Sequence, residues 1–93
     1  MKLDYDSAKR ALTLAERGLD FADCDKVFGG KTLTVEDDRQ DYGETRFQTI
    51  GSLGDRTVMV VWTVRGRSRR IISMRECNAR ERQQYQEALD RPG

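Results

Sequence analysis

The spacing of apolar residues changes its period near residue 30, and this change limits the fold more than any other feature of the chain. Before it, Ala8, Leu12, Ala15 and Leu19 recur every three or four residues, which is the pattern of an amphipathic helix. After it, apolar and polar residues alternate in short runs through residues 31–75, as they do in half-buried strands. Helices followed by consecutive strands predict an α+β domain with an antiparallel sheet.

Residues suited to helix ends stand where the helical pattern begins and stops. Asp6 is placed to cap the first helix, and Gly18 is placed to end it in a left-handed conformation. Asp20 is a candidate cap for a second, short helix. Near the C-terminus, Asn78 and Glu81 have the spacing of a capping box. We therefore expect two N-terminal helices and one C-terminal helix.

The alternating part of the chain divides into four expected strands, at residues 31–36, 44–51, 57–64 and 69–75. The third of these is the most apolar run in the protein, so it should lie in the middle of the sheet. The acidic stretch 37–43 is predicted to be a loop, and residues 2–5 are a candidate for a further short strand. The expected core is thus a four-stranded antiparallel sheet with helices before and after it.

The length of the chain favours one domain over residues 1–93, because 93 residues leave no room for a second core. No apolar run approaches the ~20 residues that a membrane-spanning helix needs. The N-terminal MKLDYDSAKR carries acidic residues where a secretion signal has its hydrophobic segment. We therefore expect a soluble, cytoplasmic protein with no membrane partner.

Several kinds of chemistry are excluded by composition. The chain has no histidine, which removes the most common general base and zinc ligand. Cys24 and Cys77 lack the spacing of metal ligands and are expected to be small buried thiols. The adjacent carboxylates at 36–38 would point apart and are interpreted as a solvated acidic loop. We expect neither a metal nor a cofactor.

Charge is segregated along the chain although its net value is only +1. The stretch 65–82 concentrates arginine, and such a local basic stripe can bind phosphate. Strict alternation in the last strand would place Arg69, Ser73 and Arg75 on an open face, with Ile72 and Met74 joining the core beneath the helices. The first three residues could then meet successive phosphates of RNA. The alternative is that these arginines are solvated surface charges.

Three further residues are candidates for a phosphate-binding or RNA-binding site. Arg46 and Arg65 offer planar guanidinium groups with two-pronged donors, and Tyr85 could stack on a base or share a proton. Each has a structural alternative: Arg46 could pair with Glu44 or Glu36, and Tyr85 could anchor the last helix. For Tyr85 the anchor interpretation is favoured. The residues by themselves support a phosphate-binding face and nothing more specific.

The order of short motifs along the chain resembles that of BrnT toxins. That family typically opens with Trp-Asp, a spaced Lys, an Asn and a Lys-His-Gly step before a helix that contains Phe. This chain is similar at Asp6, Lys9, Gly18 and Phe21, and its closing segment Arg-Ile-Ile-Ser-Met-Arg at 70–75 is the closest match. The other matching positions are Leu14, Val27, Phe28, Gly43, Glu44, Arg46, Ile50, Gly51, Val60, Val61, Thr63, Arg65, Glu81 and Tyr85.

The resemblance implies a RelE-like fold and an endoribonuclease toxin of a type II toxin–antitoxin system that halts translation. It implies neutralisation by a BrnA-type antitoxin, similar to a ribbon–helix–helix repressor, in a complex such as a heterotetramer; the free toxin is a candidate dimer. By analogy the cleavage would be metal-independent, with the RNA's own 2′-hydroxyl attacking phosphorus. Arg46, Arg65 and Arg75 would stabilise the charge that develops, Lys9 and Tyr85 would orient groups or transfer a proton, and Glu81 would fix an arginine.

The chain departs from the family pattern in its first helix. Glu16-Arg17 stands where the family typically has Lys-His, Thr13 stands at the Asn position, and Tyr5 replaces Trp. If that histidine is the catalytic base, the chain should be weak or inactive; if it is structural or contacts the antitoxin, activity should survive. The alternative functions are therefore a catalytically silent RNA- or protein-binding domain of the same fold and an interaction protein unrelated to RNA.

Overall fold

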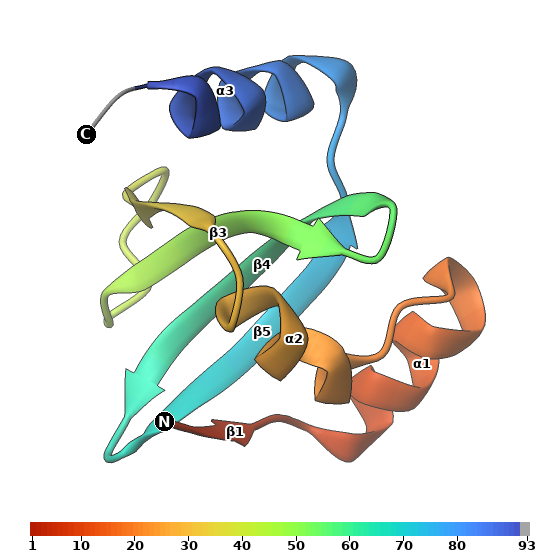
Figure 1. The fold of residues 1–93 in the computed structure, drawn as a ribbon. Helices are drawn as coiled ribbons and strands as arrows, with labels where there is room; N and C mark the ends of the chain where they lie inside the picture. Colours follow the sequence, from red (N-terminus) through yellow and green to blue (C-terminus); the bar gives the residue numbers. More distant parts are fainter. Residues whose placement is uncertain (92–93) are drawn as a thin grey trace.

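The computed structural model describes residues 1–91 and has the α+β architecture that the change of period predicts (Figure 1). Its elements, in chain order, are β1 (Lys2–Asp4), α1 (Ser7–Arg17), η1 (Phe21–Asp23), α2 (Cys24–Phe28), β2 (Thr32–Asp37), β3 (Arg46–Leu53), β4 (Arg56–Arg65), β5 (Ser68–Glu76) and α3 (Ala79–Asp90). All four expected strands are present, shifted by one or two residues at their ends.

The sheet has five strands in the order β1-β5-β4-β3-β2, and it is mixed. Strands β2 to β5 pair antiparallel, whereas β1 pairs parallel to β5, from Lys2 opposite Ser68 to Asp4 opposite Arg70. The expectation of a four-stranded antiparallel sheet is therefore wrong in detail, although residues 2–5 were a candidate strand. A three-residue strand is too short to show a periodic pattern, and its partner lies at the other end of the chain.

The helical segment before the sheet also differs from the expected pair of helices. Helix α1 begins as predicted, because the Asp6 carboxylate accepts hydrogen bonds from the N–H groups of Ala8 and Lys9, and it ends at Gly18 with φ of 66°. The second segment is a three-residue 3-10 turn, η1, that continues into the five-residue helix α2. Asp20 caps the 3-10 turn through the N–H of Ala22, so the cap was predicted correctly and the helix type was not.

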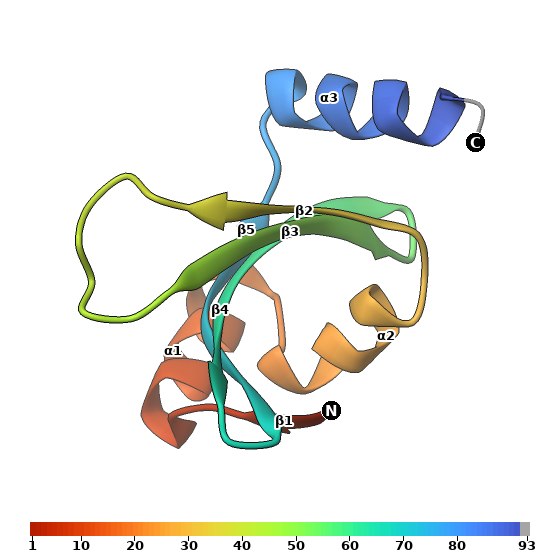
Figure 2. The same ribbon diagram turned by 90° about the vertical axis from the view of Figure 1, so that its left-hand side faces the viewer.

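The main core lies between the sheet and the segment η1–α2, around which the strongly curved sheet folds (Figure 2). Phe21, Cys24 and Val27 from this segment pack with apolar residues of β4 and β5 such as Val60 and Met74. Helix α1 contributes no fully buried side chain, and Leu12 is 57% exposed. The apolar spacing therefore predicts the helix correctly without marking the core, and of its residues only Leu19, beyond the helix end, is buried.

Helix α3 lies on the opposite face of the sheet (Figure 2). A second, smaller core joins Tyr85 of α3 and Cys77 to Ile50 of β3 and Met59 of β4. With twelve residues, α3 is the longest helix in the part of the chain that the structure describes, and no helix there has the length and apolar character to cross a membrane.

The first turn of α3 is fixed by a complete capping box. The Asn78 side chain accepts from the N–H of Glu81, and the Glu81 carboxylate accepts from the N–H of Asn78, at 2.8 and 2.9 Å. The same carboxylate accepts two hydrogen bonds from the Arg75 guanidinium, at 2.7 and 2.8 Å. These bonds, those from Arg75 first, lower the pKa of Glu81 to about 2. One carboxylate therefore joins the helix to the last strand.

Replacement of Gly51 tests the close contact between α2 and the sheet. A Cβ atom at this position would lie 2.7 Å from Cγ1 of the buried Val27, so Gly51→Ala forces the two elements apart. We expect urea denaturation to show a loss of about 1–3 kcal/mol, as is usual when a packed core is overfilled. The control is Gly30→Ala, where the nearest atom would lie at 3.8 Å and stability should stay within about 1 kcal/mol of the parent. An unchanged Gly51→Ala protein would contradict the close packing.

Acid titration of stability tests the bridge made by Glu81. Because the pKa of Glu81 in the folded chain, about 2, lies below its usual value of 4.5, its contribution is present above pH 4.5 and lost as the pH falls toward 2. Glu81→Gln should therefore lower the unfolding free energy by about 1–3 kcal/mol at pH 7, the range for hydrogen bonds to charged groups. The difference from the parent should shrink between pH 4.5 and pH 2. The exposed Glu87→Gln serves as control, and a difference independent of pH would argue against the charged bridge.

Candidate functional site

An irregularity in β5 decides where the arginines of the last strand point. Val61 pairs with Ser73 and Trp62 pairs with Ile71, so Ile72 has no partner on β4 and forms a bulge. Residues directly opposite each other in an antiparallel pair share a face. Because Trp62 lies in the core beside η1–α2, Ile71 faces that core, while Ser73 shares the opposite face with Val61.

The predicted partition of β5 into two faces is corrected by this bulge. Arg69 lies on the same side as Ile71, where its guanidinium carbon is 3.9 Å from the ring centroid of Phe28. Arg70 takes the place expected for Arg69, on the α3 side of the sheet beside Ser73. Met74 joins the core as expected, whereas Ile72 is only half-buried and lies beside α1. Strict alternation fails here because one extra residue shifts every position before it to the other face.

On the α3 side, side chains from four strands stand in one row. Asp37 of β2, Arg46 of β3, Thr63 of β4 and Arg70 of β5 are successive Cα partners, and we call this set the arginine row. The side chains of Arg46 and Arg70 are 26% and 29% exposed. Arg70 also pairs with Asp4 of β1 at 3.1 Å, which holds the guanidinium at the edge of the sheet.

Arg65 joins the arginine row through Glu44. One oxygen of the Glu44 carboxylate accepts from Nε of Arg46 at 3.2 Å, and the other accepts from Nη2 of Arg65 at 3.1 Å. The hydrogen bonds from Arg65 and Arg46 lower the pKa of Glu44, so the carboxylate stays charged between the two cations. Of the two partners considered for Arg46, Glu44 is the one that the structure shows. The trio carries one net positive charge and presents two guanidinium groups side by side.

Arg75 lies apart from this trio. Its partner on β4 is Met59, four positions from Thr63, where α3 covers the sheet and Glu81 binds both ends of the guanidinium. The hydrogen bonds that Arg75 donates to Glu81 raise the pKa of Arg75. The structure therefore brings Arg46 and Arg65 together and leaves Arg75 and Glu81 as a second pair on the same side of the sheet.

Lys9 and Ser73 meet in a hollow of about 230 Å³ between α1 and β5. Thr13, Glu16 and Arg17 also line it, together with Leu12 and Ile72. Three of the four positions at which this chain departs from the BrnT pattern, Thr13, Glu16 and Arg17, thus line the same hollow as Lys9. Nη1 of Arg17 donates to the carbonyl of Met74 at 2.9 Å, which ties the end of α1 to the strand next to the bulge.

Tyr85 is placed as a helix anchor. Its side chain is 5% exposed, and its hydroxyl donates to the carbonyl of Lys31 at 2.7 Å beneath α3. The hydroxyl also lies 3.3 Å from Oγ of Ser52. The anchor interpretation favoured from the sequence describes this position, and a buried hydroxyl with a carbonyl partner is poorly placed to meet RNA.

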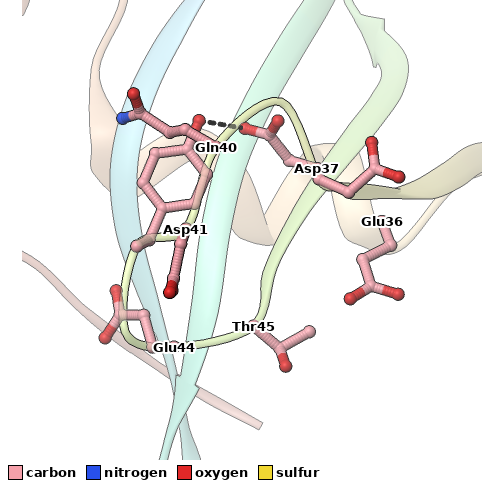
Figure 3. A pocket seen from close by; sticks show the side chains of 8 residues that line it. Glu36, Asp37, Gln40, Asp41, Glu44 and Thr45 are labelled. Carbon is pink, nitrogen blue, oxygen red and sulfur yellow. Dashed lines mark hydrogen bonds between the residues drawn. The ribbon is translucent and has the colours of Figure 1, made fainter.

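The loop after β2 corrects the interpretation of the carboxylates at 36–38 as solvated, because Asp37 ends β2 and is buried, and it contains Tyr42, which the sequence patterns did not single out. It surrounds a hollow of about 540 Å³, lined by Glu36, Asp37, Asp38, Gln40, Asp41, Tyr42, Glu44 and Thr45 (Figure 3). Asp37 is buried, accepts two hydrogen bonds from Arg39 at 2.7 Å and one from Tyr42 at 3.2 Å, and has its pKa lowered to about 2, by Arg39 above all. The ring of Tyr42 lies 4.1 Å from the guanidinium carbon of Arg46. The only signal in the sequence was an Asp at the end of a strand.

The two cysteines are not placed to act as thiolate nucleophiles at neutral pH. Cys24 and Cys77 are buried free thiols, as predicted, and burial raises their pKa values to about 12 and about 11. Within residues 1–91 there is no group of three or more Cys, Asp or Glu side chains arranged to hold a metal ion. The site is defined by its guanidinium groups, whose fixed N–H donors match the oxygens of a phosphate.

Comparison with known proteins places these features in a family. Residues 5–81, from the end of β1 to the first turn of α3, match the family model described as the ribonuclease toxin BrnT of type II toxin–antitoxin systems. No curated protein matches the chain. The matched segment contains Lys9, Glu44, Arg46, Arg65 and Arg75, and such toxins work with an antitoxin partner. The chain therefore belongs to the BrnT family of ribonuclease toxins of type II toxin–antitoxin systems.

Proposed function

We propose that the chain is a metal-independent endoribonuclease whose reacting phosphate binds at the arginine row. The observation that carries this proposal is the pairing of Arg46 and Arg65 around one carboxylate on the α3 side of the sheet, with Arg46 in the same row as Arg70. A phosphate oxygen can take the place of a carboxylate oxygen on a guanidinium group, because both accept the same two-pronged donors. The family of the chain supports RNA as the polymer that carries the phosphate.

The proposed reaction uses the substrate's own nucleophile. The 2′-oxygen forms a bond to the adjacent phosphorus as its proton is removed, the bond from phosphorus to the 5′-oxygen breaks, and that oxygen takes up a proton. Negative charge builds up on the phosphorane between these steps. Guanidinium groups fixed in advance stabilise that charge, and loss of one such donor typically lowers a rate by about 10²–10³-fold.

The candidate residues divide by position. Arg46 and Arg65 would stabilise the phosphorane. Arg75, which Glu81 fixes, would bind a flanking phosphate. Lys9 would act in proton transfer or orientation from the hollow that it shares with Ser73, an RNA-binding candidate. Tyr85 is left out of the reacting groups.

Arg69 needs a different path to the substrate. It lies on the η1–α2 side, so its proposed contact with RNA requires a strand that passes around the edge of the sheet.

The biological role that we propose follows from the family. A BrnA-type antitoxin, similar to a ribbon–helix–helix repressor, would bind the toxin in a heterotetramer and block cleavage, and free toxin in the cytoplasm would degrade RNA and halt translation. The type II class of the matched family supports a protein antitoxin of some kind. RNA cleavage by the free chain would be the activity that this antitoxin controls.

A second candidate function is a silent RNA- or protein-binding domain of the same fold. The observation that favours it is the position of Arg17, which stands where the family typically has histidine and donates to the Met74 carbonyl. A guanidinium group is charged at all accessible pH values and cannot serve as a base. The variant Glu16→Lys/Arg17→His separates the two functions: cleavage by the variant and not by the parent would identify a silent domain.

Removal of the two predicted phosphate ligands tests the proposed activity. We expect the purified parent to cleave RNA in the presence of EDTA and to arrest growth when expressed without a partner. Arg46→Ala/Arg75→Ala should lower the cleavage rate by about 10³-fold or more, since it removes a donor that stabilises the phosphorane together with the ligand of a flanking phosphate. Growth should then continue at equal levels of soluble protein.

A charge-matched control separates the site from general basicity. Arg80→Ala/Arg91→Ala removes the same charge from exposed positions on and after α3 and should leave cleavage within about 2-fold of the parent, because distant surface charges are screened. Equal losses in both double variants would show that overall charge, and not this site, drives the reaction. Intact RNA with folded parent protein would reject the active-toxin proposal.

A further inference from the structure

The guanidinium group of Arg46 is held on one face and at one edge. Its carbon lies 4.1 Å from the ring centroid of Tyr42, and its Nε donates to Glu44 at 3.2 Å. Among the residues that the structure describes, this Nε is the only atom of the group with a hydrogen-bond partner. Its two Nη groups are therefore free to donate, in an orientation that the tyrosine ring restricts.

Tyr42 is itself held by the buried carboxylate of Asp37. Its hydroxyl donates to Oδ2 of Asp37 at 3.2 Å, the bond drawn as a dashed line in Figure 3. Asp37, the last residue of β2, is the Cα partner of Arg46, the first residue of β3, so the loop that joins them begins and ends at neighbouring positions in the sheet. Two further bonds hold the loop: Gly43, with φ of 71°, donates to Asp41 at 2.8 Å, and Thr63 donates to the carbonyl of Thr45 at 2.6 Å.

We propose that Tyr42 is a positioning residue for Arg46, and that Asp37 positions Tyr42. This inference rests on the proposed function, in which Arg46 binds the reacting phosphate. Stacking on an aromatic ring leaves the edge of a guanidinium group available, and that edge carries the donors for phosphate. The acidic loop thus serves to hold one flat cation at a fixed angle on the arginine row.

Comparison with other side chains at position 42 shows what an aromatic ring contributes. A second carboxylate on the exposed side of Arg46 would compete with phosphate for the Nη donors. An aliphatic side chain would cover the guanidinium face without the attraction that a ring offers to a cation. Tyr42 supplies that attraction and keeps its hydroxyl on Asp37, away from the donors.

The test compares Tyr42→Leu and Tyr42→Phe by single-turnover cleavage of a short RNA. We expect Tyr42→Leu to lower the cleavage rate by about 10–100-fold, the scale of effects seen when a catalytic group is displaced by about 1 Å. KM should change by less than about 3-fold, because the charge of Arg46 remains. Tyr42→Phe keeps the ring but loses its bond to Asp37, so its rate should lie between those of the parent and Tyr42→Leu.

A double-variant cycle distinguishes positioning from a general structural role. In the Arg46→Ala background, Tyr42→Leu should cause no further loss, because the group that it positions is gone. Tyr5→Leu, which removes the tyrosine of a second Tyr–Arg stack 5.6 Å from Arg10, is the control for loss of a ring elsewhere and should cleave as the parent does. Equal losses from Tyr42→Leu with and without Arg46, or parent-like cleavage by Tyr42→Leu, would overturn the proposal.

A spectroscopic readout keeps this inference testable apart from the proposed function. The ring current of Tyr42 should shift the NMR signal of the Arg46 Nε proton. Tyr42→Leu should return this signal toward the position of an unstacked arginine, and Tyr42→Phe, which keeps the ring but not the bond to Asp37, should return it less. If the parent leaves RNA intact, the proposed function fails, and this signal still decides whether Tyr42 orients Arg46. A signal equally displaced in the parent and Tyr42→Leu would overturn the positioning role.

Discussion

The bulge at Ile72 is the constraint on which both the core and the arginine face depend. It lets Ile71 and Met74, three residues apart, both pack against η1–α2, where strict alternation would send one of them to the other side. Full burial of such a side chain contributes about 1.5–3 kcal/mol, a large share of the stability of a domain this small. The same irregularity places Arg70 and Ser73 together on the α3 side. One extra residue therefore stabilises the core and sets the composition of the site.

Carboxylates accompany every arginine that we place on the α3 side of the described strands. Glu44 holds Arg46 and Arg65, while Asp4 holds Arg70 and Glu81 holds Arg75. Partly exposed ion pairs such as those of Glu44 and Asp4 contribute little to stability, typically about 0–1 kcal/mol, so their main effect is on orientation. Glu81 contributes more because it also completes the capping box of α3. The ion pairs also reconcile a net charge of +1 with the phosphate-binding face that we propose, since the Glu44 carboxylate pairs with Arg46 and Arg65 and leaves the two Nη groups of Arg46 free to donate.

The parts of the fold that local chemistry controls could be predicted from the sequence, and the parts set by distant contacts could not. Asp6, Gly18, Asp20 and the Asn78–Glu81 box all act as caps, because a cap depends on residues within one turn. The parallel pairing of β1 with β5 joins the two ends of the chain, and no local pattern encodes it.

The same division applies to the candidate site: residue types could be predicted, whereas contacts between distant segments could not. Arg46, Arg65 and Arg75 were predicted from residue type and resemblance and stay predictions, and the structure places Arg46 and Arg65 around one carboxylate. Arg69 was assigned to the wrong face because a bulge is invisible to a period of two. Tyr42 was missed and Asp37 was interpreted as solvated, because their contacts with each other and with Arg46 depend on how the loop folds back onto β3, which an acidic composition does not reveal.

The hollow beside α1 separates two requirements of the proposed reaction. Arg17 bonds the strand next to the bulge, and the carbonyls of Arg17 and Gly18 accept hydrogen bonds from Arg56, so the end of α1 is fastened to β4 and β5. Arg17 suits this role because its guanidinium group donates to the Met74 carbonyl, but a guanidinium group cannot accept a proton. The charge stabilisation that we propose for Arg46 and Arg65 does not depend on whether position 17 is histidine or arginine. Removal of the proton from the 2′-hydroxyl does depend on it, because with arginine at position 17 another group must act as the base.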